Sequence, residues 1–239
     1  MSNQGINRVV IIPARGGSKR IPHKNIFPVL GRPILLRSIS ILQDSQLFSK
    51  ILVSTECSET LKICANNNIE VSGRRPAHLA TDTASLLEVL KYEVKKLLDA
   101  GEKFDDLWLY SATACLLESS DLKKASEKFQ GLANSLSLLS VVKCHTPVEW
   151  ALKITHDELV PLNPATLDIN SQTFDTTYFD AGCFAIYSFS NFLDSAYSKT
   201  IRFSPFILPR HKGIDVDTLE DISLVEILVR AKANTTGIA

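Results

Sequence analysis

Short apolar runs alternate with helix-like segments along the first two-thirds of the chain. Runs too short for helices predict buried strands at 8–13, 50–55, 69–71, 106–111 and 138–143. Between them, apolar residues recur at helical spacing and predict helices that begin near Pro33, Ser58, Leu86 and Ser119. A β-α-β-α series of this kind favours an α/β fold, with a mostly parallel sheet covered by helices on both faces.

The alternation ends in the last third of the chain. Strands are predicted at 150–155 and 183–189, and the polar stretch at 166–177 between them has little helical pattern. Neither an internal repeat nor a low-complexity linker divides the sequence. We therefore expect a single domain, residues 1–239, with a flap or dimerisation arm around 145–180.

The overall composition excludes several classes of protein. The 239 residues carry 26 Lys and Arg against 26 Asp and Glu, so the basic surplus of a general nucleic-acid binder is absent. No apolar run is long enough for a membrane span, and the polar start lacks a signal-peptide core. The five cysteines are scattered without CxxC spacing, so neither a disulfide framework nor a zinc site is predicted. We expect a cytoplasmic protein with reduced thiols.

The strongest chemical signal directly follows the first predicted strand, in the sequence PARGGSKRIPHKN at 13–25. Adjacent Gly16 and Gly17 allow a tight turn whose N–H groups converge on an anion. The four cations of this segment are Arg15, Lys19, Arg20 and Lys24. Ligands of open α/β sheets bind at the carboxyl ends of the strands, and a triphosphate suits such a loop. A solvated basic loop is the alternative. The segment matches neither the P-loop nor the dinucleotide-binding pattern.

A pair of carboxylates near the C-terminus predicts a metal site. The segment GIDVDT, at 213–218, is expected to be a short strand that enters the last helix. Strand alternation places Asp215 and Asp217 on one face, with the valine between them pointing into the core. Two such carboxylates repel unless a hard cation such as Mg²⁺ lies between them. A helix cap is the alternative role for Asp217. Thr218 and Asp221 match a capping box for the last helix.

Several motifs resemble those of one enzyme family. The runs IPARGGSKRIPHKN at 12–25 and RRPAHLATDTA at 74–84 are similar to motifs of the CMP-sugar synthetases that activate sialic, pseudaminic, legionaminic and related acids. The resemblance extends from about Val9 to Val229. It implies a Rossmann-like, GT-A-like nucleotidyltransferase fold and Mg²⁺-dependent transfer of CMP from CTP to an acidic nine-carbon sugar, as activated sugar for surface glycan synthesis. It also implies a homodimer.

The resemblance assigns roles to individual residues. Catalytic contacts with the phosphates are expected from Arg15, Lys19 and Lys24. Nucleotide contacts are expected from Ala14, Gly16, Gly17, Ser18, Asn25, Arg75, Asp82, Thr83 and Ala84. Among these, Arg75 is expected to read the cytosine, since an arginine can donate to its carbonyl oxygen and ring nitrogen. Without the resemblance, this second motif is a polar loop before a helix capped by Thr81 or Asp82. The expected ligands of Mg²⁺ are Asp215 and Asp217.

The sugar-binding segments favour pseudaminic acid as the acceptor. Sialic acid enzymes carry LQPTSP where this chain has LYSATAC, at 109–115, which is closer to the YATAP of pseudaminic acid enzymes. The segment YFDAG, at 178–182, likewise resembles their YHDAG. The sugar contacts implied are Ser111, Thr113 and Asp180. Cys115 and Phe179 depart from the pattern, and Cys115 is expected to be a buried apolar residue.

Other functions stay open at this stage. Sialic or legionaminic acid, and then the eight-carbon acid Kdo, are the alternative acceptors. A non-catalytic nucleotide-binding regulator is the alternative from a different class. The presence of the loop cations together with both aspartates argues against that regulator.

Overall fold

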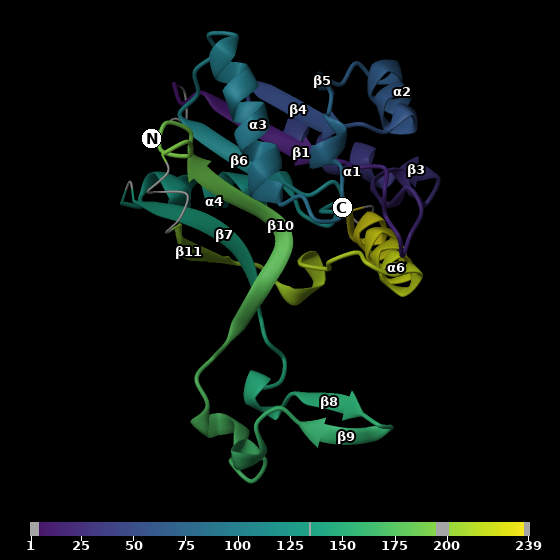
Figure 1. Cartoon of the computed structure of the whole chain (residues 1–239), viewed down its shortest axis with the longest axis vertical. Coiled ribbons are helices and arrows are strands. Elements are labelled where there is room, and N and C mark those ends of the chain that lie inside the picture. The colour runs from purple at the N-terminus through teal and green to yellow at the C-terminus, as the bar shows by residue number, and fades with distance from the viewer. Residues whose placement is uncertain (1–4, 134, 195–200, 237–239) are drawn as a thin grey trace.

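The computed structural model describes residues 5–133, 135–194 and 201–236, and its centre is a seven-stranded sheet (Figure 1). The strands of this sheet are β1 (Arg8–Pro13), β4 (Lys50–Thr55), β5 (Val71–Arg74), β6 (Asp106–Tyr110), β7 (Leu136–Lys143), β10 (Tyr178–Ser188) and β11 (Arg202–Ile207). Their order is β11-β7-β10-β6-β1-β4-β5. Only β10 runs antiparallel to its neighbours β6 and β7 in this sheet. The predicted mostly parallel α/β sheet is confirmed.

Helices cover both faces of the sheet. They are α1 (Ile34–Ser45), α2 (Ser58–Asn66), α3 (Leu86–Asp99), α4 (Ser119–Gln130) and α6 (Leu219–Thr236). In β1, Val10 and Ile12 face the core formed with α1 and α4, whereas Val9 and Ile11 face the core formed with α3. This two-sided burial follows from the alternation of side chains along a strand, and it explains why β1 is apolar throughout. The arrangement places the carboxyl ends of β1, β4 and β6 side by side.

Three of the expected element boundaries are wrong in detail. Pro33 is the N-cap of α1 rather than its first residue, because it ends a small hairpin of β2 (Pro28–Val29) and β3 (Arg32–Pro33). Ser85, and neither Thr81 nor Asp82, caps α3, through a capping box with Glu88. The expected strand at 150–155 becomes β8 (Leu152–Thr155) after a short 3₁₀ turn.

An arm projects from the body beyond the paired ends of β7 and β10 (Figure 1). It consists of the hairpin of β8 with β9 (Glu158–Pro161), followed by 3₁₀ turns within the stretch that has no helical pattern in the sequence. Ile154 pairs with Leu159 and Leu152 pairs with Pro161, so these apolar side chains share one face. Ile154 is 76% exposed and Leu159 is 67% exposed. The body of this chain leaves that apolar face uncovered.

The segment before α6 does not form the expected strand. Residues 213–217 pair with no strand among the described residues, while Val216 is fully buried beside α6. The capping box of α6 is confirmed, because Asp221 Oδ2 accepts from the Thr218 N–H and Thr218 Oγ1 accepts from the Asp221 N–H. All five cysteines are free thiols. Over the described residues, no helix has the length and apolar character required to cross a membrane.

Candidate active site

The cations of the glycine loop are organised by an aspartate from the second motif. Arg15 Nη1 lies 2.7 Å from Asp82 Oδ1, and Lys19 Nζ lies 2.6 Å from Asp82 Oδ2. The hydrogen bond from Lys19 makes the largest contribution, and with the one from Arg15 it holds the pKa of Asp82 below its ordinary value. All three side chains are exposed to solvent, so the ion pairs add little to stability. Their effect is to hold two cations together where the loop leaves β1.

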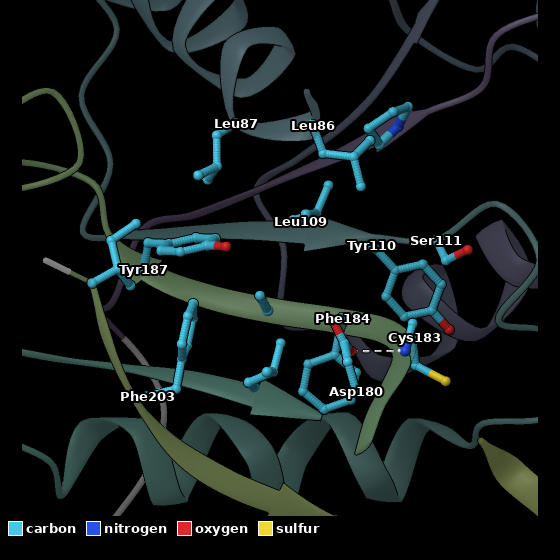
Figure 2. A pocket seen from close by; sticks show the side chains of 15 residues that line it. Leu86, Leu87, Leu109, Tyr110, Ser111, Asp180, Cys183, Phe184, Tyr187 and Phe203 are labelled. Carbon is cyan, nitrogen blue, oxygen red and sulfur yellow. Dashed lines mark hydrogen bonds between the residues drawn. The ribbon is translucent and has the colours of Figure 1, made fainter. Parts of the chain in front are cut away.

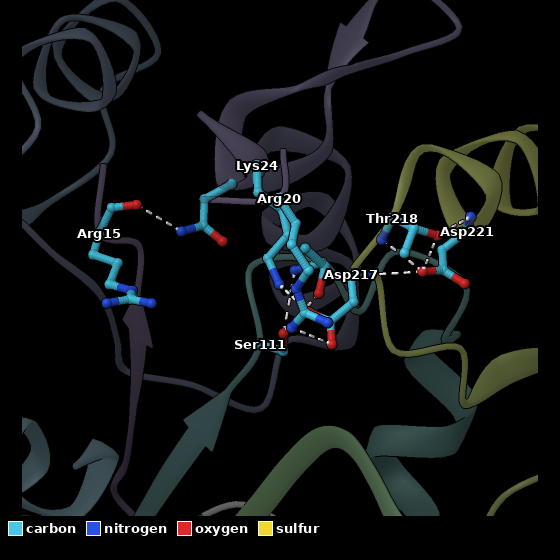
Figure 3. Close-up of polar contacts among 9 residues, drawn as sticks. Arg15, Arg20, Lys24, Ser111, Asp217, Thr218 and Asp221 are labelled. Atoms are coloured by element: carbon cyan, nitrogen blue, oxygen red, sulfur yellow. Dashed lines mark hydrogen bonds and ion pairs between the residues drawn. The ribbon is translucent and has the colours of Figure 1, made fainter. Parts of the chain in front are cut away.

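The residues that follow β4 contact the turn of the glycine loop and hold it in place. The Gly16 N–H donates to Glu56 Oε1 at 2.7 Å, and a Cβ atom on Gly16 would lie only 3.0 Å from the Cβ of Cys57. Any larger residue at position 16 would crowd Cys57, so this close approach favours glycine. Asn25 Nδ2 donates to the backbone carbonyl of Arg15 at 2.9 Å (Figure 3). Asn25, near the end of the loop, thus holds the backbone at the start of the loop.

Asp217 meets the second half of the same loop. Arg20 Nη2 lies 2.7 Å from Asp217 Oδ2, and Lys24 Nζ lies 3.0 Å from Asp217 Oδ1 (Figure 3). The hydrogen bond from Lys24 is the main reason that the pKa of Asp217 is below its ordinary value. The Asp217 N–H donates to the capping carboxylate of Asp221. The cap of α6 is therefore Thr218 with Asp221, which leaves the Asp217 side chain directed at the loop.

Asp215 is held in a different environment from its neighbour. Its carboxyl carbon would lie 3.6 Å from a Cβ atom on Gly182, which has φ +62° at an irregularity in β10. Desolvation raises the pKa of Asp215, and the charge of Asp217 raises it further. Two neighbouring carboxylates that repel each other are a donor set suited to a hard cation. The donors of this pair therefore fit Mg²⁺, and the positive φ beside Asp215 is the conformation that favours a glycine at position 182.

Arg75 is buried at the carboxyl end of β4. It is 4% exposed, and its Nε donates to Ser54 Oγ at 3.0 Å while Nη2 donates to the Ser54 carbonyl. Ser54 Oγ in turn donates to Glu93 Oε1 of α3 at 2.5 Å. Burial lowers the pKa of Arg75, and the charges of Glu56 and Glu93 oppose that shift. The guanidinium is thus anchored in a buried polar network that reaches the edge of the site.

The sequence reasoning did not identify Glu56 or Glu93 as site residues. Glu56 comes directly after a predicted strand, at the same edge of the sheet as the loop, and that position is a signal that could have found it. Glu93 is a fully buried charge on the face of α3 formed by Leu90, Val94 and Leu97. A carboxylate within an otherwise apolar helix face indicates a buried partner, which here is reached through Ser54.

A polar cavity of about 450 Å³ gathers most of the predicted nucleotide contacts. Its lining comprises Pro13, Arg15, Ser18, Lys19, Arg20, Lys24, Asn25, Arg75, Leu79, Thr81, Asp82, Ala84, Leu86, Val89 and Asp217. Thr83 lies outside this lining, and its Oγ1 contacts Thr81 Oγ1 at 3.2 Å in the turn before α3. Ala14, Gly16 and Gly17 also lie outside it, and both backbone polar groups of Ala14 bond to β4. The cavity has the cations that a nucleoside triphosphate requires.

An apolar cavity of about 510 Å³ adjoins the polar one and shares Pro13 and Leu86 with it. Figure 2 shows side chains from α3, β6, β10 and β11 around it, with Ser111 and Asp180 at one end. Asp180 Oδ1 accepts from the Gly182 N–H at 2.8 Å. Thr113 does not line this cavity but contacts Ser111, at 2.9 Å between their hydroxyl oxygens. The cavity can therefore hold a molecule with apolar groups and a few hydroxyls.

The two departures from the family motifs lie outside both cavities. Cys115 is buried among apolar residues, and burial raises the pKa of its thiol to about 11. It is therefore protonated at neutral pH, as expected of a small apolar residue. Phe179 is 49% exposed on the outer part of β10. Neither residue contributes a polar group to the apolar cavity.

Comparison with known proteins gives consistent matches. A family model described as cytidylyltransferase matches residues 9–166. The pseudaminic acid cytidylyltransferase of Campylobacter jejuni subsp. jejuni serotype O:2 is 30% identical over 227 residues, which cover 94% of this chain and 97% of that protein. The N-acylneuraminate cytidylyltransferase of Streptococcus agalactiae serotype V is 28% identical over 217 residues, which cover 89% of this chain and 51% of that protein.

Solved structures support the same fold. A structure of CMP:2-keto-3-deoxy-manno-octonic acid synthetase complexed with CTP has a TM-score of 0.67 at 14% identity, covering 95% of this chain and 99% of that one. A 4-diphosphocytidyl-2C-methyl-D-erythritol synthase has a TM-score of 0.67 at 13% identity, covering 94% of this chain and 98% of that one. At such low identity these likenesses establish the fold alone.

Proposed function

The chain belongs to the cytidylyltransferase family, and on that premise we propose that it transfers CMP from CTP to a nonulosonic acid, an acidic nine-carbon sugar, and releases pyrophosphate. One observation carries the proposal. A polar cavity with loop cations adjoins an apolar cavity of sugar size at the carboxyl edge of the sheet, and Asp217 lines the polar one. This arrangement brings a nucleotide and an acceptor to a common boundary, as transfer in a single step requires.

The reaction is a single displacement at phosphorus. An oxygen of the sugar's anomeric hydroxyl attacks the α-phosphorus of CTP, and the bond to the bridging oxygen of the β-phosphate breaks, so that pyrophosphate leaves with the electron pair. The hydroxyl proton passes to solvent or to a nearby base. Catalysis of this kind rests on positioning and charge neutralisation. Arg15 and Lys19 exchange their contacts with Asp82 for contacts with the triphosphate, and Lys24 is placed to reach the α-phosphate.

Asp215 and Asp217 would hold Mg²⁺. When bound, this ion neutralises charge on the α-phosphate as pyrophosphate leaves. Arg20 and Lys24 pair with Asp217, whereas desolvation raises the pKa of Asp215 and the charge of Asp217 raises it further. Asp217, which would hold the metal together with Asp215, is thus also the residue that pairs with two cations of the glycine loop.

Arg75 supports cytosine as the base. Its bonds to Ser54 fix the guanidinium at the wall of the polar cavity. These contacts leave other N–H donors of its five for the carbonyl oxygen and ring nitrogen of cytosine. Because Arg75 is anchored to Ser54 and through it to Glu93, little side-chain entropy is lost on binding.

Pseudaminic acid is the acceptor that the apolar cavity supports best. Leucine, phenylalanine and tyrosine side chains dominate its walls, including Leu86, Tyr187 and Phe203. Such a lining suits an acceptor with acyl and methyl groups better than one with a fully hydroxylated tail. Relatives named as pseudaminic acid cytidylyltransferases agree with this preference. Sialic and legionaminic acids are the alternative acceptors.

A second copy of the chain is proposed to cover the arm. A two-stranded hairpin alone in water is marginally stable, and the β8–β9 hairpin presents an apolar face to solvent. Pairing with a symmetric partner would bury Ile154 and Leu159 in a homodimer. The arm leaves the body directly beyond Asp180, so a partner held there would sit beside the apolar cavity.

Pyrophosphate release tests the proposed function. The full chain is incubated with Mg²⁺, one nucleoside triphosphate and one acidic sugar from a panel of pseudaminic, legionaminic, N-acetylneuraminic and eight-carbon acids. Release is expected with CTP and a nine-carbon acid, and not with ATP, GTP or UTP. Binding of CTP without release for any sugar would instead favour a nucleotide-binding regulator.

A further inference from the structure

Three potential metal ligands meet beside the glycine loop, outside the site described above. Within residues 5–133, 135–194 and 201–236, one group of three His, Cys, Asp or Glu residues has its ligand atoms within 4.8 Å of one another, namely His23, Cys57 and Glu59. Cys57 Sγ lies 3.9 Å from His23 Nδ1 and donates to Glu59 Oε2 at 3.1 Å. Cys57 and Glu59 are two positions apart, whereas His23 is 34 positions from Cys57, so the spacing matches no zinc motif and the fold brings His23 to the other two residues.

The spacing of the three atoms fits a tetrahedral zinc ion. Zinc bonds to sulfur, nitrogen and oxygen are about 2.0–2.3 Å long, so tetrahedral ligand atoms lie about 3.3–3.6 Å apart. The observed 3.9 Å and 3.1 Å lie on either side of this range. Cys57 is buried, whereas His23 and Glu59 are exposed.

The chemistry of the donors selects against the metal proposed for the aspartate pair. A thiolate and an imidazole are soft and borderline ligands that favour Zn²⁺, whereas Mg²⁺ requires oxygen ligands. One thiolate, one carboxylate and one neutral imidazole balance the charge of a divalent ion. Binding would release the Cys57 thiol proton to solvent.

The position of the cluster links it to the glycine loop. The side chain of Cys57 lies close to the backbone of the loop at Gly16. A Cβ atom added to Gly16 would be 3.0 Å from the Cβ of Cys57 and 3.2 Å from its Sγ. His23 has a left-handed backbone, φ 54°, and immediately precedes Lys24. Glu59 belongs to the first turn of α2. A metal on these ligands would therefore connect the far end of the loop to the helix beneath its turn.

We propose that His23, Cys57 and Glu59 bind Zn²⁺, and that this ion fastens the glycine loop to the first turn of α2. The site is distinct from the aspartate pair and does not depend on the proposed sugar. An ion that binds the folded chain and not the unfolded one stabilises the fold by mass action. It also restrains the loop in the conformation in which its cations surround the polar cavity.

Metal binding to the metal-free full chain tests the proposal. Zn²⁺ is titrated in competition with a chromogenic chelator in the presence of excess Mg²⁺, and Co²⁺ is used to look for a thiolate-to-metal absorption band. One ion per chain is expected, with the band present. Since loss of an outer-shell partner already weakens metal binding by about 10–100-fold, Cys57→Ser should weaken it at least as much and remove the band.

Matched variants separate this site from others. Asparagine tolerates the left-handed backbone, so His23→Asn should weaken Zn²⁺ binding without disturbing the loop. His156→Asn is the control, because His156 is also an exposed histidine with a positive φ, 51°, and it should not weaken binding. Cys144→Ser is the cysteine control and should bind normally. Zn²⁺ should raise the Tm of the wild type but not of Cys57→Ser. The proposal is overturned if no Zn²⁺ binds, or if Cys57→Ser and His23→Asn bind as tightly as the wild type.

Discussion

Lys24 Nζ lies 3.0 Å from Asp217 Oδ1, although the two residues are 193 positions apart in sequence. The contact joins the last cation of the glycine loop to the segment before α6 (Figure 3). It means that the proposed triphosphate site and the proposed metal site share one electrostatic unit. Arg20 and Lys24 pair with Asp217, and in the proposed reaction these cations would contact the nucleotide while Asp217 would hold the metal.

Asp217→Asn tests the metal assignment. Loss of the carboxylate removes a ligand of Mg²⁺, which supplies several kcal/mol of transition-state stabilisation, so kcat should fall by at least about 100-fold. The fold should persist, because the partly exposed contacts with Arg20 and Lys24 contribute little to stability. Pyrophosphate release and circular dichroism measure the two effects. Asp44→Asn, on the exposed side of α1, is the control. Near-normal turnover of Asp217→Asn would refute the assignment.

Asp215→Asn tests whether the ionised carboxylate of Asp215 destabilises the fold. Desolvation and the charge of Asp217 raise the folded pKa of Asp215, so its ionised form disfavours the fold at pH values above that folded pKa. The variant should therefore have a slightly higher Tm than the wild type at neutral pH and low Mg²⁺. The difference should shrink as the pH falls through the folded pKa toward the unfolded value of about 3.9. A lower Tm for Asp215→Asn at neutral pH, with Asp44→Asn unchanged, would contradict this account.

Phe203→Ser tests the apolar cavity as the sugar site. Phe203 lines that cavity and is 39% exposed, so its replacement should leave the fold intact. Loss of about 40 Å² of apolar contact corresponds to about 1 kcal/mol, and KM for the sugar should rise about fivefold. KM for CTP should not change. Ile207→Ser, an exposed residue on the same strand, is the control. An equal rise in KM for CTP would place the sugar elsewhere.

Ile154→Asp tests the proposed homodimer. A charge on the apolar face of the β8–β9 hairpin should be incompatible with burial against a second copy. Light scattering after size-exclusion chromatography should find a dimer for the wild type and a monomer for the variant at the same concentration. Ile207→Asp, outside the arm, should remain dimeric. A monomeric wild type, or a dimer that survives both Ile154→Asp and Leu159→Asp, would exclude the arm as the interface.

The strands at the centre of the sheet could be predicted from the sequence because their signals are local. β1, β4 and β6 are buried on both faces, and each reads as a continuous apolar run. β11 was not predicted, because its exposed residues and Pro205 resemble a loop. An edge strand tolerates a proline, and its partner β7 lies far away in sequence.

The site residues that could be predicted are likewise those with a local sequence signal. The glycine loop and the aspartate pair were recognisable because each is a short run with its own chemistry. Glu56 and Glu93 were missed, since their roles depend on Gly16 and Ser54, which only the folded sheet brings near. The proximity of His23 to Cys57 likewise depends on the fold. The register of β1 and β4 sets the distance between the two loops that follow these strands.

A competition for limiting CTP tests the central claim most directly. The full chain, Mg²⁺ and equal amounts of pseudaminic, legionaminic and N-acetylneuraminic acids are mixed, and the CMP-sugars are separated and identified by nuclear magnetic resonance. The account predicts that CMP-pseudaminic acid is the main product and that pyrophosphate forms in equal amount. A predominance of another CMP-sugar would contradict the proposed acceptor, and the absence of any CMP-sugar with CTP bound would contradict the proposed activity itself.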